Sequence, residues 1–449
     1  MIEQQPQPQG FLHWLRESVT IKLIFIGILI LVLLIPSAMI NSLIQERAQR
    51  QDDTVKTVTD QYSGDQLIQG PVLAIPYRDQ QTQSDSKGQF TTTEVIKMLY
   101  VLPNELSYKG NISSEVLHRG IYAVPVYNGT IKVSGNFTKA DLASLSLKPE
   151  QLIPGKASLL FSISDLKGLK TNPQVTVAGQ TLTAEPAAGD RPFANSLQVA
   201  VNLDGQLNNP VPFAFSLEIK GSQEINFLHI GKTTDVELTG NWASPSFGGR
   251  YLPDTRVVND KGFSAKWRML YYNRPFPQQW VQDNDLLTND KRSADATFGI
   301  KFKLPVDDYQ KTMRTSKYAI LIIMLTFVSL FLTEMIRKQK VHVFNYILIG
   351  AAMIIYYTLL LSFSEQVGYN IAYLIASVAT IGLIAVFLAS LLKNGKAAIV
   401  FTFILTLFYS FIYVLIQLED LSLLMGSIAL FIIVAALMYS SRKINWDKP

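Results

Sequence analysis

The chain has 449 residues, of which 48% are hydrophobic, and its formal net charge is +5. It contains no cysteine, which excludes disulfides, a thiol nucleophile, an iron–sulfur cluster and a thiolate zinc site. The polar stretch 41–315 is nearly neutral, with 29 bases and 28 acids, whereas residues 316–449 hold 9 bases and 5 acids. The positive charge therefore indicates membrane orientation and not nucleic-acid binding.

The first apolar segment, Leu23–Ile40, predicts a transmembrane anchor. It is longer than the apolar core of a secretory signal and no A-x-A site follows it, so we expect the anchor to be retained. Arg16 and Lys22 precede it, and basic flanks stay on the cytoplasmic side of a membrane. Residues 1–22 are therefore predicted to form a cytoplasmic leader. Pro36 is expected to kink or end the anchor helix.

The polar stretch after the anchor, residues 41–316, is predicted to be an exported, mainly β domain. It opens with Ser42–Asp60, whose charges predict a solvated helical stalk. Further on, apolar residues alternate with smaller or polar ones, which is typical of strands with one buried face. The clearest alternating apolar residues are Phe213, Phe215, Leu217 and Ile219. Turns follow them and predict an antiparallel meander, and Asn128-Gly129 predicts a hairpin turn. These patterns predict an antiparallel, sandwich-like domain.

Residues 317–440 contain five further apolar segments and are predicted to form a five-helix transmembrane bundle. Each segment has the ~20 apolar residues that a helix needs to cross a bilayer. The segments are Lys317–Ile336, Val343–Phe363, Ile371–Leu392, Ala397–Ile416 and Leu421–Ser440. Together with the anchor they predict an α-helical integral membrane protein with six spans.

The charges of the connecting loops alternate along this bundle. The loops after the first and third segments are basic, as is the tail, residues 441–449, whereas the other two loops carry only acidic charges. The basic residues are Arg337, Lys338, Lys340, Lys393, Lys396, Arg442, Lys443 and Lys448. Short basic loops remain in the cytoplasm. Both termini are therefore predicted to be cytoplasmic and residues 41–316 periplasmic, in the inner membrane of a bacterium.

Sequence motifs for enzymatic chemistry are missing. The chain has no H-E-x-x-H, no P-loop and no G-x-G-x-x-G. Ser264 lacks the final glycine of a serine elbow. The histidines are scattered; they are His13, His118, His229 and His342. We therefore expect no enzymatic activity, no metal site and no cofactor.

Three acidic residues at the predicted outer face of the bundle are candidate ligand or interdomain-contact residues: Glu365, Glu419 and Asp420. Charges beside a membrane are costly and often functional. These residues can bind a ligand or a proton, contact Arg or Lys across domains, or lie solvated in acidic loops. Glu334, at the inner end of its span, is expected to pair with a base one helical turn away.

An aromatic group in the exported domain is the second candidate site. Its members are Trp242, Pro245, Phe247, Tyr251 and Trp267. They either form an exposed patch that binds a partner or pack in the core, and large aromatic residues are more often core residues.

Several segments of the chain resemble the CreD family of bacterial inner-membrane proteins, over nearly the full length. The matching motifs are Lys22–Ile40, Gln69–Tyr77, Arg119–Tyr127, Trp242–Phe247, Tyr251–Pro253, Gly262–Trp267, Pro305–Lys311, Leu359–Glu365, Glu419-Asp420 and Leu423–Ser427. The resemblance implies a protein of the Gram-negative inner membrane linked to envelope integrity and the response to cell-wall stress. It implies no catalytic residues.

Two functions follow as hypotheses. In the first, a non-enzymatic protein of the lipid bilayer binds an envelope partner, a protein, lipid or glycan, through its periplasmic domain. In the second, a transporter or lipid-handling protein has a ligand site at the periplasmic mouth of the bundle. The sequence does not predict the oligomeric state.

Overall fold

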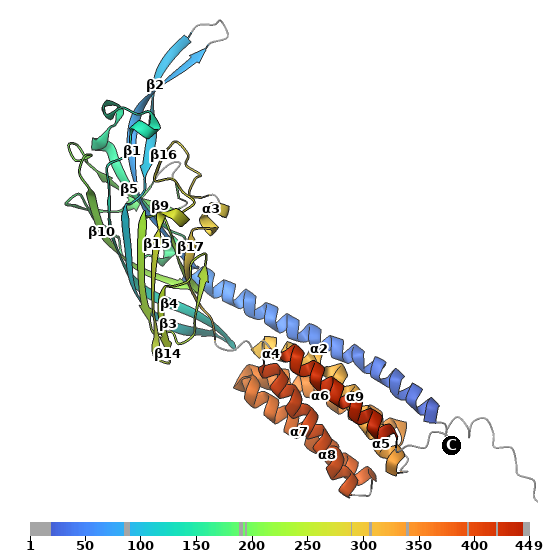
Figure 1. Ribbon diagram of the computed structural model, residues 1–449. Coiled ribbons are helices and arrows are strands. Elements are labelled where there is room, and N and C mark those ends of the chain that lie inside the picture. The colour runs from blue at the N-terminus through green and yellow to red at the C-terminus, as the bar shows by residue number, and fades with distance from the viewer. Residues whose placement is uncertain are drawn as a thin grey trace, which may run out of the picture. The chain divides into compact units, whose positions relative to one another are not determined.

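The computed structural model describes residues 19–84, 90–187, 192–193, 195–288, 290–304, 308–337, 341–392, 395–418 and 421–442 (Figure 1). The predicted leader up to residue 18 and most of the predicted tail lie outside them. The chain divides into two compact units. We call Met1–Asp52 together with Val306–Pro449 the helical unit, and Asp53–Pro305 the β-unit.

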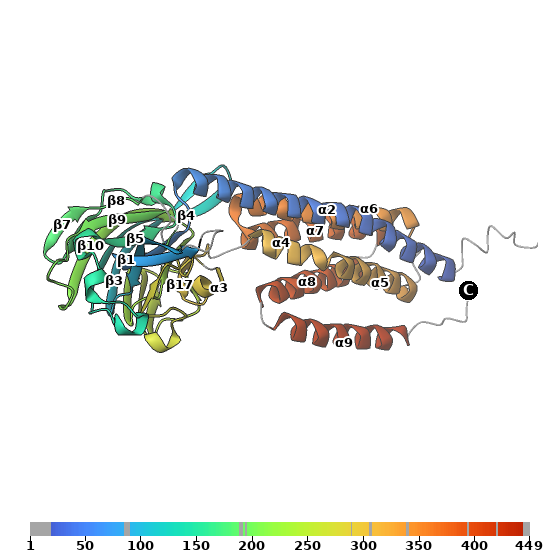
Figure 2. The same ribbon diagram turned by 90° about the horizontal axis from the view of Figure 1, so that it is seen from above.

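The helical unit is built from long apolar helices and one short polar helix, α4 (Figure 2). Their bounds are Val19–Tyr62 for α2, Asp308–Lys317 for α4, Ala319–Arg337 for α5, Val343–Val367 for α6, Tyr369–Leu392 for α7, Gly395–Gln417 for α8 and Ser422–Ser441 for α9. Among the described residues, five helices are long and apolar enough to cross a membrane, namely α2 and α5 to α8. The sixth predicted span coincides with α9, whose described apolar stretch, Leu424–Ala436, is shorter.

The predicted anchor and stalk form one continuous helix, α2, of 44 residues. Pro36 lies inside α2 and does not end it; membrane helices tolerate an internal proline. Leu29 and Leu33 of α2 are buried in the same apolar cluster as α5 and α6. At Gly350 of α6 an added Cβ would lie 2.4 Å from Leu33 Cδ1. The glycine therefore lets α2 and α6 approach closely.

The β-unit consists of two sheets. Within its described residues, one sheet has the strands β1 (Gln66–Ser84), β2 (Phe90–Val101), β5 (Ala157–Ile163), β8 (Glu185–Pro186), β9 (Ser196–Val201), β11 (Glu224–Leu228), β13 (Pro245–Gly249), β16 (Gln279–Val281) and β17 (Thr297–Phe302). The other has β3 (Glu105–Arg119), β4 (Tyr122–Phe137), β6 (Gln174–Val177), β7 (Gln180–Thr183), β10 (Val211–Ser222), β12 (Thr233–Gly240), β14 (Thr255–Asn259) and β15 (Gly262–Leu270). A short helix, α3 (Asp290–Ala294), precedes β17.

Both sheets bury one face in a shared apolar core. Along β10 burial alternates residue by residue, so the alternation predicted from Phe213 to Ile219 is confirmed. Aromatic rings pair across the two sheets: Phe161 of β5 lies 4.7 Å from Phe215 of β10, measured between ring centroids. Such pairs hold the sheets face to face through contacts worth more than their buried area alone.

The predicted antiparallel arrangement holds only for part of the domain, because both sheets are mixed. β1 runs parallel to β11, and β12 runs parallel to β3. Parallel neighbours are joined by long connections, whereas tight turns join only antiparallel ones. Local turn signals therefore identify antiparallel pairs and miss these two.

The predicted meander after Phe213 is wrong, because β10 and β12 belong to one sheet and β11 to the other. The chain changes sheet at Gln223, which has a positive φ of 55°. Gly221 lies inside β10 and makes no turn; a Cβ there would lie 2.4 Å from the hydroxyl oxygen of Tyr127. The glycine thus makes room for a core side chain.

Asn128-Gly129 forms no hairpin turn, since it lies within β4. It pairs with β3 on one side and with β10 on the other. The turn between β3 and β4 is Gly120-Ile121, where Gly120 has a φ of +63°. Two-residue hairpin loops need positive φ, which glycine adopts without strain.

Candidate functional site

The carboxylate of Glu365, near the end of α6, is held by other residues of the helical unit. Tyr309 Oη of α4 donates a hydrogen bond to Glu365 Oε1 at 2.9 Å. Arg47 Nε of α2 lies 3.9 Å from the same oxygen, and the Glu365 side chain is 13% exposed. Glu365 therefore has a cation and a hydroxyl as partners, and a ligand role for it stays a prediction.

The short helix α4 carries most of the polar contacts at this end of the helical unit. Asp308 Oδ1 accepts a hydrogen bond from the backbone nitrogen of Tyr369, the first residue of α7, at 3.1 Å. Lys311 Nζ donates to Gln417 Oε1 of α8 at 3.3 Å. Because Tyr309 reaches α6, this one helix ties together the ends of α6, α7 and α8.

The other two acidic candidates, Glu419 and Asp420, lie outside the described residues. The last residues described before them include Gln417, whose amide donates to Asn370 Oδ1 of α7 at 2.6 Å. A role for Glu419 and Asp420 at the mouth of the bundle thus stays a prediction.

Glu334 binds a cation from a distant part of the chain, Lys22 of α2. Its two oxygens also accept hydrogen bonds from the backbone nitrogen of Val341 and from Tyr346 Oη of α6, both at 3.1 Å. Lys22 Nζ in turn donates to the carbonyl oxygen of Val341 at 2.7 Å. The expected partners one helical turn away have no described side chain. No specific signal in the sequence predicts the pair of Glu334 with Lys22. The pair follows only the general rule that a charge at membrane depth is paired with another group.

The aromatic candidates of the β-unit lie in or against the core. Trp242 is 9% exposed and Trp267 is 2% exposed. Trp267 packs on Phe247 of β13, with ring centroids 5.9 Å apart, and donates its ring N–H to the carbonyl oxygen of Tyr251 at 3.2 Å. Phe247, Tyr251 and Pro245 are half-buried. Phe247 also contacts the edge strand β14 (Thr255–Asn259), since Arg256 Cζ lies 5.8 Å from the centroid of its ring.

The edge strand β14 exposes all five of its residues. Among the described strands, β14 pairs with β15 alone and ends the order of its sheet. Val257 is 62% exposed and Val258 44% exposed. Successive side chains of a strand point to opposite faces, so this edge presents an apolar side chain on each face. Edge strands are usually protected by charges or proline.

His229 is fully buried beside β15 and neutral. Its Nδ1 lies 2.9 Å from Thr234 Oγ1, and its Nε2 lies 3.2 Å from the carbonyl oxygen of Leu270. Burial lowers its pKa to about 4, the Leu270 hydrogen bond opposes this and the charge of Arg274 adds to it. Among the described residues, no three His, Asp or Glu side chains are grouped to hold a metal ion.

The β-unit is expected to lose about 2 kcal/mol of stability between pH 7.5 and pH 5 through His229. The pKa of His229 in the folded chain lies below the ordinary value of 6.5. The unfolded chain therefore binds the proton first as the pH falls, so stability is full above pH 6.5 and declines below it. Thermal unfolding followed at both pH values measures this loss. His229→Gln, which keeps a donor for Leu270, should flatten the pH dependence; an equally steep decline in the variant would contradict the assignment.

Comparison with known proteins finds a family match over nearly the whole chain. The sequence model of the family described as Inner membrane protein CreD matches residues 18–447. The inner membrane protein CreD of Escherichia coli (strain K12) is 29% identical over 418 residues, which cover 93% of this chain and 91% of that protein. The resemblance seen in the sequence motifs is thereby confirmed, and the chain belongs to the CreD family of inner membrane proteins.

Proposed function

We propose that this protein supports the integrity of the bacterial envelope by binding an envelope protein through its β-unit, on the periplasmic side of the inner membrane. The proposal is of a binding protein and not of an enzyme. The location in the inner membrane follows from the family. The alternating charges of the loops support a periplasmic β-unit with both termini in the cytoplasm.

The exposed edge strand β14 is the observation that carries the proposal. Its free edge among the described strands and its two exposed valines, Val257 and Val258, offer what an added strand needs. In such strand addition, backbone hydrogen bonds supply affinity and alternate side chains supply specificity. An extended segment of a partner protein fits this edge better than a lipid or a glycan does. The half-buried Phe247 packs on the buried Trp267, and Arg256 Cζ of β14 lies 5.8 Å from the centroid of the Phe247 ring, so the edge contacts the aromatic group.

The alternative function, a transporter or lipid-handling protein with its site at Glu365, has less support. The Glu365 carboxylate is already engaged by Tyr309 and Arg47. Loss of function in Glu365→Gln with unchanged melting would favour this alternative over the proposal.

Val257→Lys is expected to reduce partner binding at least about tenfold, because it replaces an apolar contact for the added strand with a second charge on an edge that already carries Arg256. Since Val257 is 62% exposed, Val257→Lys should fold normally. A photoreactive amino acid placed at Val257 in living cells measures binding as the yield of crosslinked protein.

The matched control is Ser216, an exposed residue of the inner strand β10. A crosslinker at Ser216 should capture no defined protein, and Ser216→Lys should leave the function unchanged. Equal crosslinking from Val257 and Ser216 would refute binding at this edge. So would full envelope integrity in cells that lack the wild-type protein and carry only Val257→Lys.

A further inference from the structure

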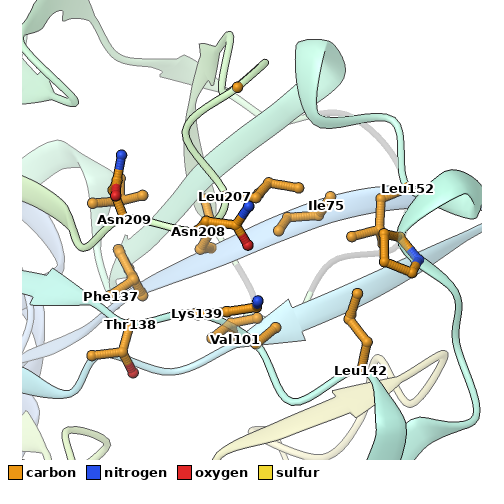
Figure 3. A pocket seen from close by; sticks show the side chains of 15 residues that line it. Ile75, Val101, Phe137, Thr138, Lys139, Leu142, Leu152, Leu207, Asn208 and Asn209 are labelled. Carbon is orange, nitrogen blue, oxygen red and sulfur yellow. The ribbon is translucent and has the colours of Figure 1, made fainter.

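An apolar pocket of about 250 Å³ opens in the β-unit where β2 and β4 end and β10 begins. Its floor comes from both sheets and is formed by buried side chains (Figure 3). These are Leu73, Ile75, Val101, Phe137 and Val211. The pocket thus reaches into the shared core.

The mouth of the pocket has a different character. It is formed by Thr138, Lys139, Ala140 and Leu142, which follow β4, and by Gly205, Leu207, Asn208 and Asn209, which precede β10. Lys139, Asn208 and Asn209 are exposed there, above the half-buried Leu142 and Leu207. Among the fifteen described lining residues Lys139 alone ionises. Figure 3 shows the Lys139 nitrogen and the Asn208 carboxamide among the apolar side chains.

We propose that this pocket binds a single acyl chain with an anionic head group. The chain would occupy the floor and the head group would lie at Lys139, with the amides of Asn208 and Asn209 as further donors. A positive mouth without acidic lining residues favours an anion, and charge-assisted hydrogen bonds are the strong ones.

The lining also argues against other ligand classes. A sugar would bury hydroxyl groups against the apolar floor without hydrogen-bond partners, which is costly. An engineered apolar cavity of about 150 Å³ holds the six carbons of benzene, so this pocket suits a chain of about ten carbons. Free fatty acids and lysophospholipids share this chemistry, and both occur at membranes. The site does not involve β14.

The test uses the full-length protein in lipid nanodiscs and a decanoate that carries a diazirine at its methyl end. After illumination, the label is expected on the β1 and β2 residues of the floor, around Leu73 and Val101. These residues are no more than 3% exposed, so only a chain inside the pocket reaches them. The same probe built as a lysophosphatidylglycerol tells a phosphate head group from a carboxylate.

Unlabelled carboxylates of six to fourteen carbons should compete for the site. Affinity is expected to rise about fourfold for each methylene, because each buried methylene adds the same transfer free energy. The rise should stop near ten carbons, where the pocket is full. Competition that keeps rising beyond twelve carbons would indicate partition into lipid and would overturn the proposal.

Substitutions then separate the head from the chain. Lys139→Gln should weaken binding of the anionic probe about tenfold and leave a decanol probe unchanged. Leu207→Trp should fill the pocket and abolish labelling by both. Lys132→Gln is the matched control, because Lys132 is an exposed lysine of β4 that does not line the pocket.

Melting of each variant shows whether it is folded. Label on the helices alone, or equal floor labelling of wild type, Lys139→Gln and Leu207→Trp, overturns the proposal. Val257→Lys should label like wild type, so this result and that of partner binding at β14 can fail separately.

Discussion

Glu334→Gln is expected to destabilise the helical unit by about 3 kcal/mol or more, the usual cost of breaking a buried ion pair. The substitution leaves the ammonium of Lys22 largely buried, with its side chain 20% exposed and without its carboxylate. It also weakens the two hydrogen bonds that the Val341 backbone nitrogen and Tyr346 Oη donate to the Glu334 carboxylate, both at 3.1 Å. One carboxylate thus joins α2, α5 and α6 at one end of the unit, and its loss should loosen all three.

Thermal unfolding in nanodiscs measures the effect, and a double substitution tests its cause. Lys22→Met alone should also destabilise, whereas Lys22→Met with Glu334→Gln should cost less than the sum of the two, because no lone charge is left buried. The control is Glu46→Gln, which removes an exposed pair with Arg50 and should change stability by no more than about 0.5 kcal/mol. Equal melting of Glu334→Gln and Glu46→Gln would show that the pair contributes little.

Phe298→Ala is expected to destabilise the β-unit by about 3–5 kcal/mol, the range for removing a buried aromatic side chain. Phe298 of β17 is fully buried. Its ring lies 5.7 Å from that of Trp267 in the other sheet and 6.0 Å from that of Phe227 in its own. The cavity left behind would lie against Trp267 of β15, the strand that pairs with β14, so partner binding should fall together with stability.

Unfolding of the variants in urea, followed by tryptophan fluorescence, gives the free energies. Phe298→Leu keeps most of the volume and should cost under about 1.5 kcal/mol. Tyr272→Ala, at a side chain that is 76% exposed, should change little. A loss in Phe298→Ala no larger than in Tyr272→Ala would mean that the cavity collapses, and it would remove the link between the aromatic core and partner binding at the edge.

The candidate sites differ in how much of each can be predicted from the local sequence pattern. Glu365 stands out in a sequence as a lone charge beside apolar spans, but its partners Arg47 and Tyr309 come from α2 and α4, far away along the chain. For Trp242 and Trp267 the pattern allowed both a patch and a core, and the structure buries them. The edge strand β14 had no signal, because exposure of a strand depends on which strands pair with it.

The pairing of strands shows the same limit. Alternation in β10 follows from one segment alone, since burial of one face needs only period two. That β11 leaves the sheet of β10 and β12 follows from the crossing at Gln223 and from the pairing of β1 with β11, over 150 residues apart. Asn128-Gly129 has the composition of a turn, yet partners on both sides hold it extended.

Hydropathy and loop charge are properties of each segment by itself. The sequence was therefore sufficient to predict the apolar spans, the basic and acidic loops and the strand-rich nature of the β-unit. The family membership also followed from short motifs read in order. The partners of Glu334 and Glu365, the mixed sheets, the open edge at β14 and the pocket beneath Lys139 came from the folded chain alone. Each of them depends on residues that are distant along the chain and meet only when the core is packed.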